Sequence, residues 1–500
     1  MKAKILIAAT GIFFLSFASC KKDYLETTPT DQVDNSAVFT TTSNANTSLN
    51  GIYRYMFQRY SAQNQPGVGG ILLNLDFMGD DIGQATSAWY SSEAGGWLSH
   101  RADNSALVSY SYRFFYRIIG NANFIIDNIE TSEGSDEDRK KIKAEALTLR
   151  AYGHFFLVQM FGKRYDAAIK PNAQLGVPLM LSSTDSNKPR ATVEEVYTQI
   201  NKDLDAAIAL NVSTRLNKSH INVLVAKGLR ARVALTMQDY PNAIKFAKEV
   251  IDSGTFPLMS TTEYQAGFND AQAVAEFMWA SIPAADQADT FGSFFSQIAY
   301  NANTTYMRGN PKRINSNTYN KISSTDVRKK MWEPAPIAAN FPLPLTTFQR
   351  FPYMSRKFSV KVVGQPTLGH VPLMRSAEMY LILAEAYAKT TGGDINARTT
   401  LFSLVSKRDP SAVISTNAGQ ALIDEILQNR RVELWGEGFR FLDLKRLNLP
   451  LDRTAAAFPN FVPLTSAGTV SIPAGDPKWQ YLIPRDEMEA NTALAGQQNP

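Results

Sequence analysis

The chain of 500 residues has few of the side chains that hold metals or carry out covalent chemistry. Cys20 is its one cysteine and its four histidines are scattered, so a Cys/His metal site has no support in the sequence. The HExxH motif, the GxxxxGKS/T phosphate loop and the GxSxG nucleophile motif are all missing. The sequence therefore predicts no metal centre, no cofactor and no catalytic residue.

A hydrophobic run near the N-terminus is too short to cross a membrane. Residues 5–17 form a run of thirteen, whereas a membrane-spanning helix needs about 20. Lysines precede this run and small residues followed by Cys20 end it, so residues 1–19 are predicted to be a signal peptide. The ending resembles a lipobox, in which the cysteine becomes an acylated membrane anchor and residues 20–40 a lipidated tether. A plain secretory peptide with a chance cysteine is the alternative.

The chain also lacks a strong excess of either charge. Its formal net charge is +5, and removal of Lys2 and Lys4 with the signal peptide leaves +3. No basic run exceeds three residues, which excludes an electrostatic nucleic-acid binder. Hydrophobic residues make up 44% of the chain and charged residues 19%, which is typical of a globular protein.

Helical periodicity dominates the rest of the chain. The predicted helices span residues 41–60, 105–130, 138–161, 192–208, 223–237, 243–251, 374–389 and 396–408. Residues 222–252 resemble a tetratricopeptide unit in three ways. They have small residues, a proline at the turn and a length close to the roughly 34 residues of such a unit. An ordinary helical hairpin is the alternative there. Several such hairpins along the chain favour a solenoid.

Irregular segments interrupt these helices. Residues 71–97 are predicted to be irregular, and residues 256–370 have no helical period of any length. Only residues 276–282 in the second segment read as a short strand. We therefore predict a mostly α fold, a tetratricopeptide-like helical-hairpin solenoid with long irregular insertions and a few short strands. So long an irregular stretch is usually functional.

Charged and apolar side chains are interleaved over residues 429–448 too tightly to form two separate helix faces. Neighbours of opposite charge are three residues apart, which places them side by side on a helix. Gly436 and Gly438 would let the chain bend. We predict a half-buried ion network that joins neighbouring helices, in which loss of one partner costs about 3–5 kcal/mol. Its predicted members are Arg430, Arg431, Glu433, Glu437, Arg440 and Asp443.

Glu433 and Glu437 could instead be the paired carboxylates of a glycosidase. One helical turn would place them about 5–6 Å apart at Cβ, compatible with a retaining mechanism. Each, however, has an arginine at ion-pair spacing, which would keep both ionised and remove the general acid. The structural interpretation is therefore favoured.

A better candidate for ligand binding lies near the N-terminus, where Asp80 and Asp81 are followed by Trp89, Tyr90 and Trp97. Aromatic rings for stacking and carboxylates for hydrogen bonding are how a shallow site holds a sugar. The alternative is that the tryptophans fill the helical core, since tryptophan is buried on average.

Three segments together resemble one known family. RRVELWGEGFRFLDLKR at residues 430–446 is similar to RR-x-EL-x-x-EG-x-R-x-x-DL-x-R of the SusD/RagB outer-membrane nutrient-binding lipoproteins. Asn429 differs, because the family usually has an acidic residue there. AEALTLRAYGHFFLVQMFG at residues 144–162 and IPRDEMEANTALAGQQNP at residues 483–500 resemble two further family blocks. Asp326-Val327-Arg328 resembles the family's D-x-R.

The resemblance implies a non-catalytic capture protein, lipid-anchored at the outer membrane and exposed at the surface. It would pass a nutrient to a SusC-like TonB-dependent barrel, with a glycan as the first expectation and a peptide as the second. Residues 41–500 would form one SusD-like unit, with an N-terminal part of residues 41–220 and a C-terminal part of residues 221–500. The irregular insertions would carry the ligand side, and the solenoid the transporter side. A secreted glycoside hydrolase and a tetratricopeptide scaffold for protein partners are the two alternatives.

Overall fold

The structure is a computed structural model that describes residues 39–83, 94–334, 351–363, 367–453 and 470–500. The predicted signal peptide and all but the last two residues of the predicted tether, Cys20 included, lie outside these ranges. Of the helices inside them, none combines the length and the hydropathy that crossing a bilayer requires.

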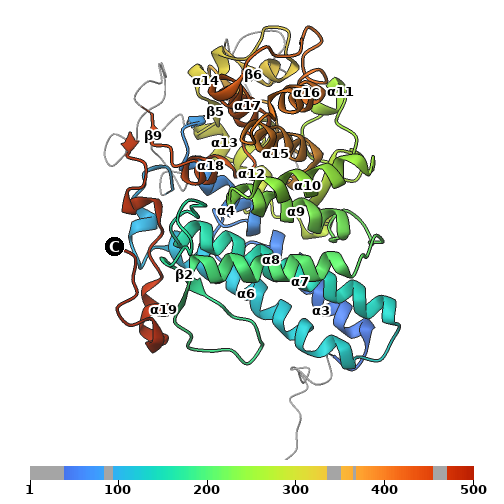
Figure 1. Cartoon of the computed structure of the whole chain (residues 1–500), viewed down its shortest axis with the longest axis vertical. Helices are drawn as coiled ribbons and strands as arrows, with labels where there is room; N and C mark the ends of the chain where they lie inside the picture. Colours follow the sequence, from blue (N-terminus) through green and yellow to red (C-terminus); the bar gives the residue numbers. More distant parts are fainter. Residues whose placement is uncertain (1–38, 84–93, 335–350, 364–366, 454–469) are drawn as a thin grey trace, which may run out of the picture.

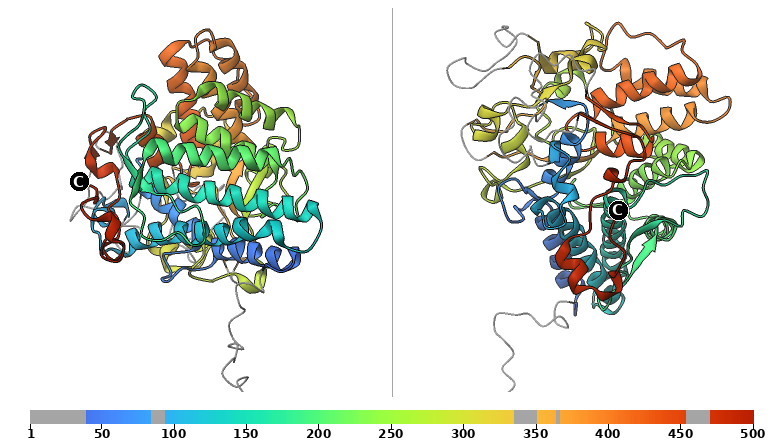
Figure 2. Two further views of the ribbon diagram at one scale, coloured as in Figure 1. Left: turned by 60° about the horizontal axis from the view of Figure 1, so that its bottom comes forward. Right: turned by 90° about the vertical axis from the view of Figure 1, so that its left-hand side faces the viewer.

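The long helices form a ladder in which each packs against its neighbour in the chain (Figures 1 and 2). From the bottom of Figure 1 upward the ladder runs through α3 (Thr42–Phe57), α6 (Ala106–Asn128), α7 (Asp136–Phe161), α8 (Val193–Ala209), α9 (Val223–Thr236), α10 (Tyr240–Asp252) and α15 (Ser376–Ala388), with α16 (Asp394–Val405) and α17 (Gly419–Glu433) above α15. The predicted mostly helical fold of stacked hairpins is confirmed.

Local capping signals set where these helices begin. At the start of α8, Thr192 Oγ1 accepts from the Glu195 amide, and the Glu195 carboxylate accepts from the Thr192 amide. Ser105, Ser135 and Asn222 cap α6, α7 and α9 with their side chains. Each such cap contributes about 1 kcal/mol. The predicted bounds of these helices are therefore close to the observed ones.

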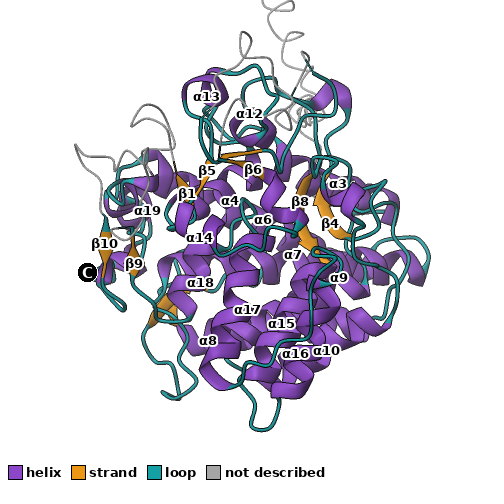
Figure 3. Ribbon diagram, turned by 90° about the horizontal axis from the view of Figure 1, so that it is seen from above, coloured by secondary structure: helices purple, strands orange, loops and turns teal. Residues whose placement is uncertain are grey.

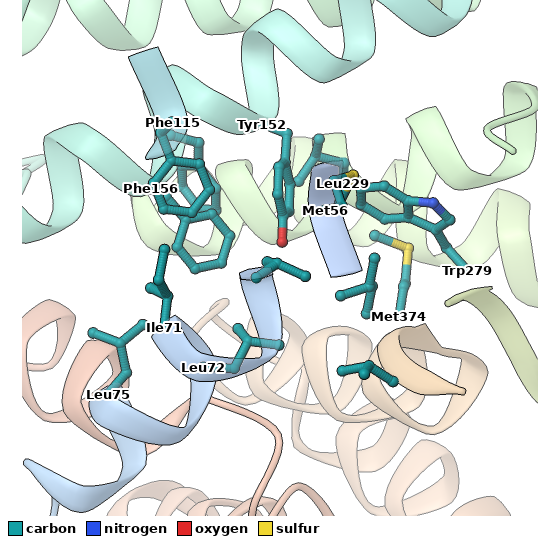
Figure 4. Close-up of a cluster of buried hydrophobic side chains, with 14 of the residues drawn as sticks. Met56, Ile71, Leu72, Leu75, Phe115, Tyr152, Phe156, Leu229, Trp279 and Met374 are labelled. Atoms are coloured by element: carbon teal, nitrogen blue, oxygen red, sulfur yellow. The ribbon is translucent and has the colours of Figure 1, made fainter. Parts of the chain in front are cut away.

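Helix α4 (Gly67–Phe77) lies partly in a segment that was predicted to be irregular. Ile71, Leu72 and Leu75 of α4 are buried inside the ladder, close to Phe115 and Phe156 (Figure 4). Almost every residue of α4 is buried, so the helix has no polar face and hence no amphipathic period. Its glycine-rich beginning also disfavours helix formation. The prediction was wrong for the residues that α4 covers, because tertiary burial rather than local pattern forms this helix.

The inner side of the ladder is filled. Strand β4 (Phe277–Ser281) pairs antiparallel with β8 (Val371–Arg375), and Trp279 and Met374 from this pair lie beside Tyr152 and Leu229 of the ladder (Figure 4). These side chains belong to one continuous hydrophobic core that includes α4. The open concave groove that a tetratricopeptide scaffold would need is therefore occupied here.

Residues 256–370 were predicted to lack long helices, and the described part of this segment has none. Its helices have four or five residues: α11 (Thr261–Tyr264), α12 (Phe294–Ile298), α13 (Thr305–Gly309) and α14 (Ser316–Asn320). A four-stranded antiparallel sheet lies beside them (Figure 3), in the order β1 (Ile82–Gly83), β5 (Arg313–Ile314), β7 (Met354–Ser355) and β6 (Trp332–Glu333). The remaining strands and α-helices are β2 (Leu175–Pro178), β3 (Arg190–Thr192), α18 (Arg440–Arg446), β9 (Leu451–Asp452), β10 (Ser471–Ile472) and α19 (Arg485–Ala490).

The C-terminal residues are fastened to the end of α7. Asn499 donates to the carbonyl oxygens of Phe161 (2.7 Å) and Tyr481 (2.6 Å). Its side-chain oxygen accepts from Arg190 (2.9 Å) and Gln480 (3.0 Å). All four hydrogen bonds of this amide are thus made within a buried environment.

Asn499→Ala should lower the free energy of unfolding by about 2 kcal/mol, because it leaves buried donors and acceptors without partners. Urea unfolding followed by tryptophan fluorescence measures the change. Asn396→Ala on the exposed side of α16 is the control and should stay within about 0.5 kcal/mol of the unaltered chain. Equal unfolding midpoints for the two variants would contradict this role of Asn499.

Candidate functional site

The segment 429–448 folds as two helices, α17 and α18, separated by a tight break. Gly436 and Gly438 in the break have φ angles of +80° and +88°, which residues with a Cβ rarely adopt. The Asp76 carboxylate of α4 accepts from the amides of Gly438 (2.9 Å) and Arg440 (3.0 Å) and so caps α18. Burial raises the pKa of Asp76 to about 7, although both amides oppose this.

Glu433, at the end of α17, is the centre of a buried ion network. Its carboxylate accepts from Arg375 (3.1 Å), from Arg408 (3.0 and 3.2 Å) and from Arg328 (3.4 Å). Glu276 binds both Arg375 and Arg408, the latter at 2.8 Å. All five side chains are essentially inaccessible to solvent. The network therefore joins α17 to β4, β8, the loop after α16 and the irregular segment.

Glu437 extends this network through the break. It accepts from Lys357 (2.6 Å) and from two nitrogens of Arg375 (2.7 and 2.9 Å). Burial alone would raise the pKa of Glu437, but Arg375 and Lys357 outweigh burial and lower it. Arg408, Arg375 and Arg328 outweigh burial in the same way and hold the pKa of Glu433 far below its usual range.

A second branch joins α17, α18 and α15. Asp443 binds Arg430 and Arg446, each at 2.7 Å. Arg446 also makes a bidentate pair with Glu385 of α15, at 2.5 and 2.8 Å. Arginine side chains suit such buried pairs because their planar donors match two carboxylate oxygens.

The predicted members of the network are thus all in ion pairs, but with other partners than predicted. Pairs three residues apart on one helix were expected, such as Glu437 with Arg440. The break between α17 and α18 separates these residues, and their partners come from distant parts of the chain. Asn429, the departure from the family pattern, accepts from Arg328 at 2.8 Å.

Asp80 and Asp81, predicted to contact a ligand, are ion-paired within the protein. Arg431 donates to Asp81 at 2.6 and 2.9 Å, and Arg440 donates to Asp80 at 2.5 and 3.0 Å. Burial would raise the pKa of Asp80, but Arg440 and Arg431 hold it well below its usual range. We therefore correct the interpretation: both aspartates join α4 and β1 to the helices of the ion network.

Trp97, predicted to stack on a ligand, lies in the core. It is 1% exposed, and its Nε1 donates to the Met78 carbonyl oxygen at 2.8 Å. Its ring contacts that of Trp479 edge to face, with 4.7 Å between centroids. For Trp97 the alternative interpretation, that the tryptophan fills the core, is therefore the correct one. Trp89 and Tyr90 lie outside the described residues.

The buried carboxylates are unsuited to glycosidase chemistry. Glu433 and Glu437 are both inaccessible, and their lowered pKa values keep them ionised at neutral pH. A general acid must be protonated and must reach the glycosidic oxygen. Within the described ranges, no group of three or more His, Cys, Asp or Glu side chains is placed to hold a metal ion.

Surface clefts of a size that suits a small ligand occur at three places in the described structure. The α7–α18 cleft (about 320 Å³) includes Lys163, Arg164, Asp166, Lys445, Asp476 and Trp479. The α3–β4 cleft (about 510 Å³) includes Asn50, Arg54, Leu216, Asn217, His220, Ser281 and Gln287. The α6–α19 cleft (about 400 Å³) includes Tyr112, Arg113, Tyr116, Asn123, Asp185 and Glu487. The sequence analysis missed all three, because each is lined by segments far apart in the chain.

One family-like residue lies beneath the α3–β4 cleft. Glu145, in the AEALTLRA segment of α7, accepts from Tyr53 (2.5 Å) and the Ile221 amide (3.3 Å) and contacts His220 Nδ1 (2.9 Å). Burial, followed by the Glu145 charge, raises the pKa of Tyr53 well above its usual value. The resemblance marked Glu145 as a family position, but nothing in the sequence identified these partners.

A ladder of helical hairpins joined by a buried ion network is the architecture of a helical-repeat protein, and its surface clefts have a size that suits a ligand. Two family models match the chain: one described as starch-binding associating with outer membrane over residues 23–235, and the SusD family over residues 290–500. The chain belongs to the SusD/RagB family.

Known relatives match almost the full length of the chain. SusD-like protein P2 of Formosa agariphila is 24% identical over 473 residues, which cover 88% of this chain and 90% of that protein. The crystal structure of a SusD-like carbohydrate binding protein from Bacteroides vulgatus is 26% identical, with a TM-score of 0.79 over 92% of this chain and 99% of that one. A laminarin binding SusD-like protein shares the fold at 19% identity, with a TM-score of 0.68 and coverage of 92% and 100%.

Proposed function

We propose that this protein binds a glycan at the surface of the outer membrane and delivers it, without chemical change, to a SusC-like TonB-dependent barrel. One observation carries the proposal: the similarity in sequence and fold to a SusD-like carbohydrate binding protein extends over nearly the whole of both chains. A peptide is the alternative ligand.

The described structure supports binding by a rigid frame. The ion network ties the ladder to the irregular segment through buried pairs, so these two parts of the frame are held together before a ligand arrives. Preformed clefts save the ordering cost of binding. The buried carboxylates of Glu433 and Glu437 are engaged with arginine and lysine, which suits them to this frame rather than to bond cleavage.

A calorimetric screen of the purified chain against a glycan panel tests ligand binding. We expect at least one glycan to bind and to be recovered with unchanged chain length. If only peptides bind, the ligand is the peptide alternative and not a glycan. Release of shortened glycans would overturn the non-catalytic role.

Affinity purification from detergent-solubilised outer membranes tests the transporter partnership. A large β-barrel protein should co-purify with the chain. Recovery of the chain without such a partner would overturn the delivery step while leaving ligand binding intact.

Cys20→Ser should move the protein from the membrane fraction to the soluble fraction, because an unmodified N-terminus carries no lipid chains to bury. Fractionation followed by immunoblotting measures this, and mass spectrometry of the mature N-terminus of the unaltered chain should find the acylated cysteine. A neighbouring Ser19→Ala variant is the control and should remain membrane-bound. Membrane retention of the Cys20 variant would contradict the anchor.

A further inference from the structure

We propose that the α3–β4 cleft binds a sugar residue that carries a carboxylate, so that the glycan is an acidic one. This inference rests on the proposed glycan-binding function and adds a site and a class of ligand to it. Four features of the cleft carry it: its charge, its unpartnered polar groups, its rigid walls and its apolar rim.

Helix α3 passes β4 and β8 (Figure 3), and residues of these three elements line the cleft. Asn50, Gly51 and Arg54 of α3 form one wall, and the loop that ends at His220 forms the opposite wall. A Cβ placed on Gly51 would meet no atom within 4 Å, so this wall is open to the cleft. The end of β4 at Ser281 completes the lining.

The lining of this cleft holds one charged side chain, the positive Arg54. No aspartate or glutamate lines it, whereas Asp166 and Asp476 line the α7–α18 cleft. The Glu145 carboxylate lies beneath the lining, where it is bound by Tyr53 and His220. The exposed Arg54 guanidinium makes no ion pair or hydrogen bond with the side chains that the structure describes. A guanidinium binds a carboxylate through two parallel hydrogen bonds, which favours an acidic sugar over a neutral one.

Two further polar groups of the cleft lack partners within the described ranges. Ser281 is 4% exposed, and its Oγ has no hydrogen bond. The Nδ1 atom of His220 is held by Glu145, while its Nε2 has no partner in the same part of the chain. A buried hydroxyl without a partner costs free energy, and a sugar hydroxyl or carboxylate oxygen would satisfy it.

The loop wall is fixed against β4. Arg215 donates to the carbonyl oxygens of His220 (3.2 Å) and Met278 (2.6 Å). Trp279 Nε1 donates to the Ser219 carbonyl oxygen at 2.9 Å, and the Ala280 amide donates to the Lys218 carbonyl oxygen at 3.0 Å. The wall therefore keeps its shape without a ligand, as a preformed site requires.

Apolar side chains at the rim suit the C–H face of a sugar ring. Leu216 is 71% exposed at the cleft, and Phe57 and Ile282 also line it. Apolar side chains grouped beside a few polar groups are typical of a small-ligand site. At about 510 Å³ the cleft falls in the range of small-ligand sites.

The test measures binding of uronate tetramers to the detergent-solubilised full chain by calorimetry, each tetramer against its carboxyl-reduced neutral counterpart. The panel holds galacturonate, mannuronate and alternating glucuronate tetramers. We expect at least one acidic tetramer to bind at least about tenfold more tightly than its reduced form.

Arg54→Gln should weaken binding of that tetramer about tenfold and leave its reduced form unaffected. Ser281→Ala should also weaken binding while keeping or raising thermal stability, because it removes an unpartnered buried hydroxyl. Lys202→Gln, which removes an exposed positive charge from α8, is the matched control and should bind like the unaltered chain.

Acid-selective binding that survives both cleft substitutions would overturn the inference, and so would a preference for the reduced tetramers. Both results leave the proposed glycan-binding function in place. Absence of binding to every glycan tested, acidic or neutral, would overturn the proposed function together with the inference.

Discussion

Glu433→Gln should lower the free energy of unfolding by about 3–5 kcal/mol. The substitution keeps the size of the side chain but removes the charge that faces Arg375, Arg408 and Arg328. These guanidinium groups are buried and would be left with too little negative charge around them. Breaking one partner of a buried network costs far more than loss of an exposed pair, which is worth less than about 1 kcal/mol.

Urea unfolding at pH 7 measures this change, with Glu489→Gln on the exposed side of α19 as the control. The control should shift the free energy of unfolding by less than about 0.5 kcal/mol. A Glu433 variant as stable as the control would show that the network contributes nothing to the frame.

The stability lost in this variant should also depend on pH. A glutamate in the unfolded chain has a pKa of about 4.3, and the pKa of folded Glu433 is lower. Its contribution to stability is therefore complete above that pH and is lost as the pH falls below it. Between about pH 4.5 and 3, the free energy of unfolding should fall more steeply for the unaltered chain than for Glu433→Gln.

Gly438→Ala should lower the free energy of unfolding by about 2–3 kcal/mol. Its φ of +88° strains any residue that has a Cβ, and the new Cβ would lie 2.9 Å from Cα of Leu72 and closer still to the Leu72 side chain. The break between α17 and α18 would have to move away from α4. That movement would pull the Gly438 amide from Asp76.

Gly120→Ala in α6 is the control for this substitution. A Cβ at Gly120 meets nothing within 4 Å, and its helical backbone accepts alanine, so a small stabilisation of about 0.4–1 kcal/mol is expected. Urea unfolding of both variants measures the contrast. Equal and small effects would mean that the break tolerates a side chain.

The long amphipathic helices could be predicted from the sequence because local pattern and tertiary role agree. The apolar stripe of α6 and the capping box of α8 each mark a helix that buries one face. Helix α4 could not be predicted in this way, because it is buried all round and its burial depends on the rest of the fold. Local propensity gives no signal for such a helix.

For the site, the sequence identified charges but not their partners. The interleaved pattern of residues 429–448 marked the ion network, yet Glu433 binds arginines contributed by three other segments. Asp81 and Arg431 are 350 positions apart, a separation that no spacing rule covers. The aromatic residues near Asp80 were predicted to form a stacking surface, because a single sequence does not show which aromatic side chains are exposed.

The attachment of Asn499 to Phe161 spans 338 positions and has a consequence for biogenesis. A chain that leaves the ribosome with its N-terminus first can form these hydrogen bonds only after residue 499 has been synthesised. The end of α7 therefore receives its last partners long after its own synthesis. A truncation that removes Asn499 would leave Arg190 and Gln480 as the side-chain donors to the Phe161 carbonyl oxygen.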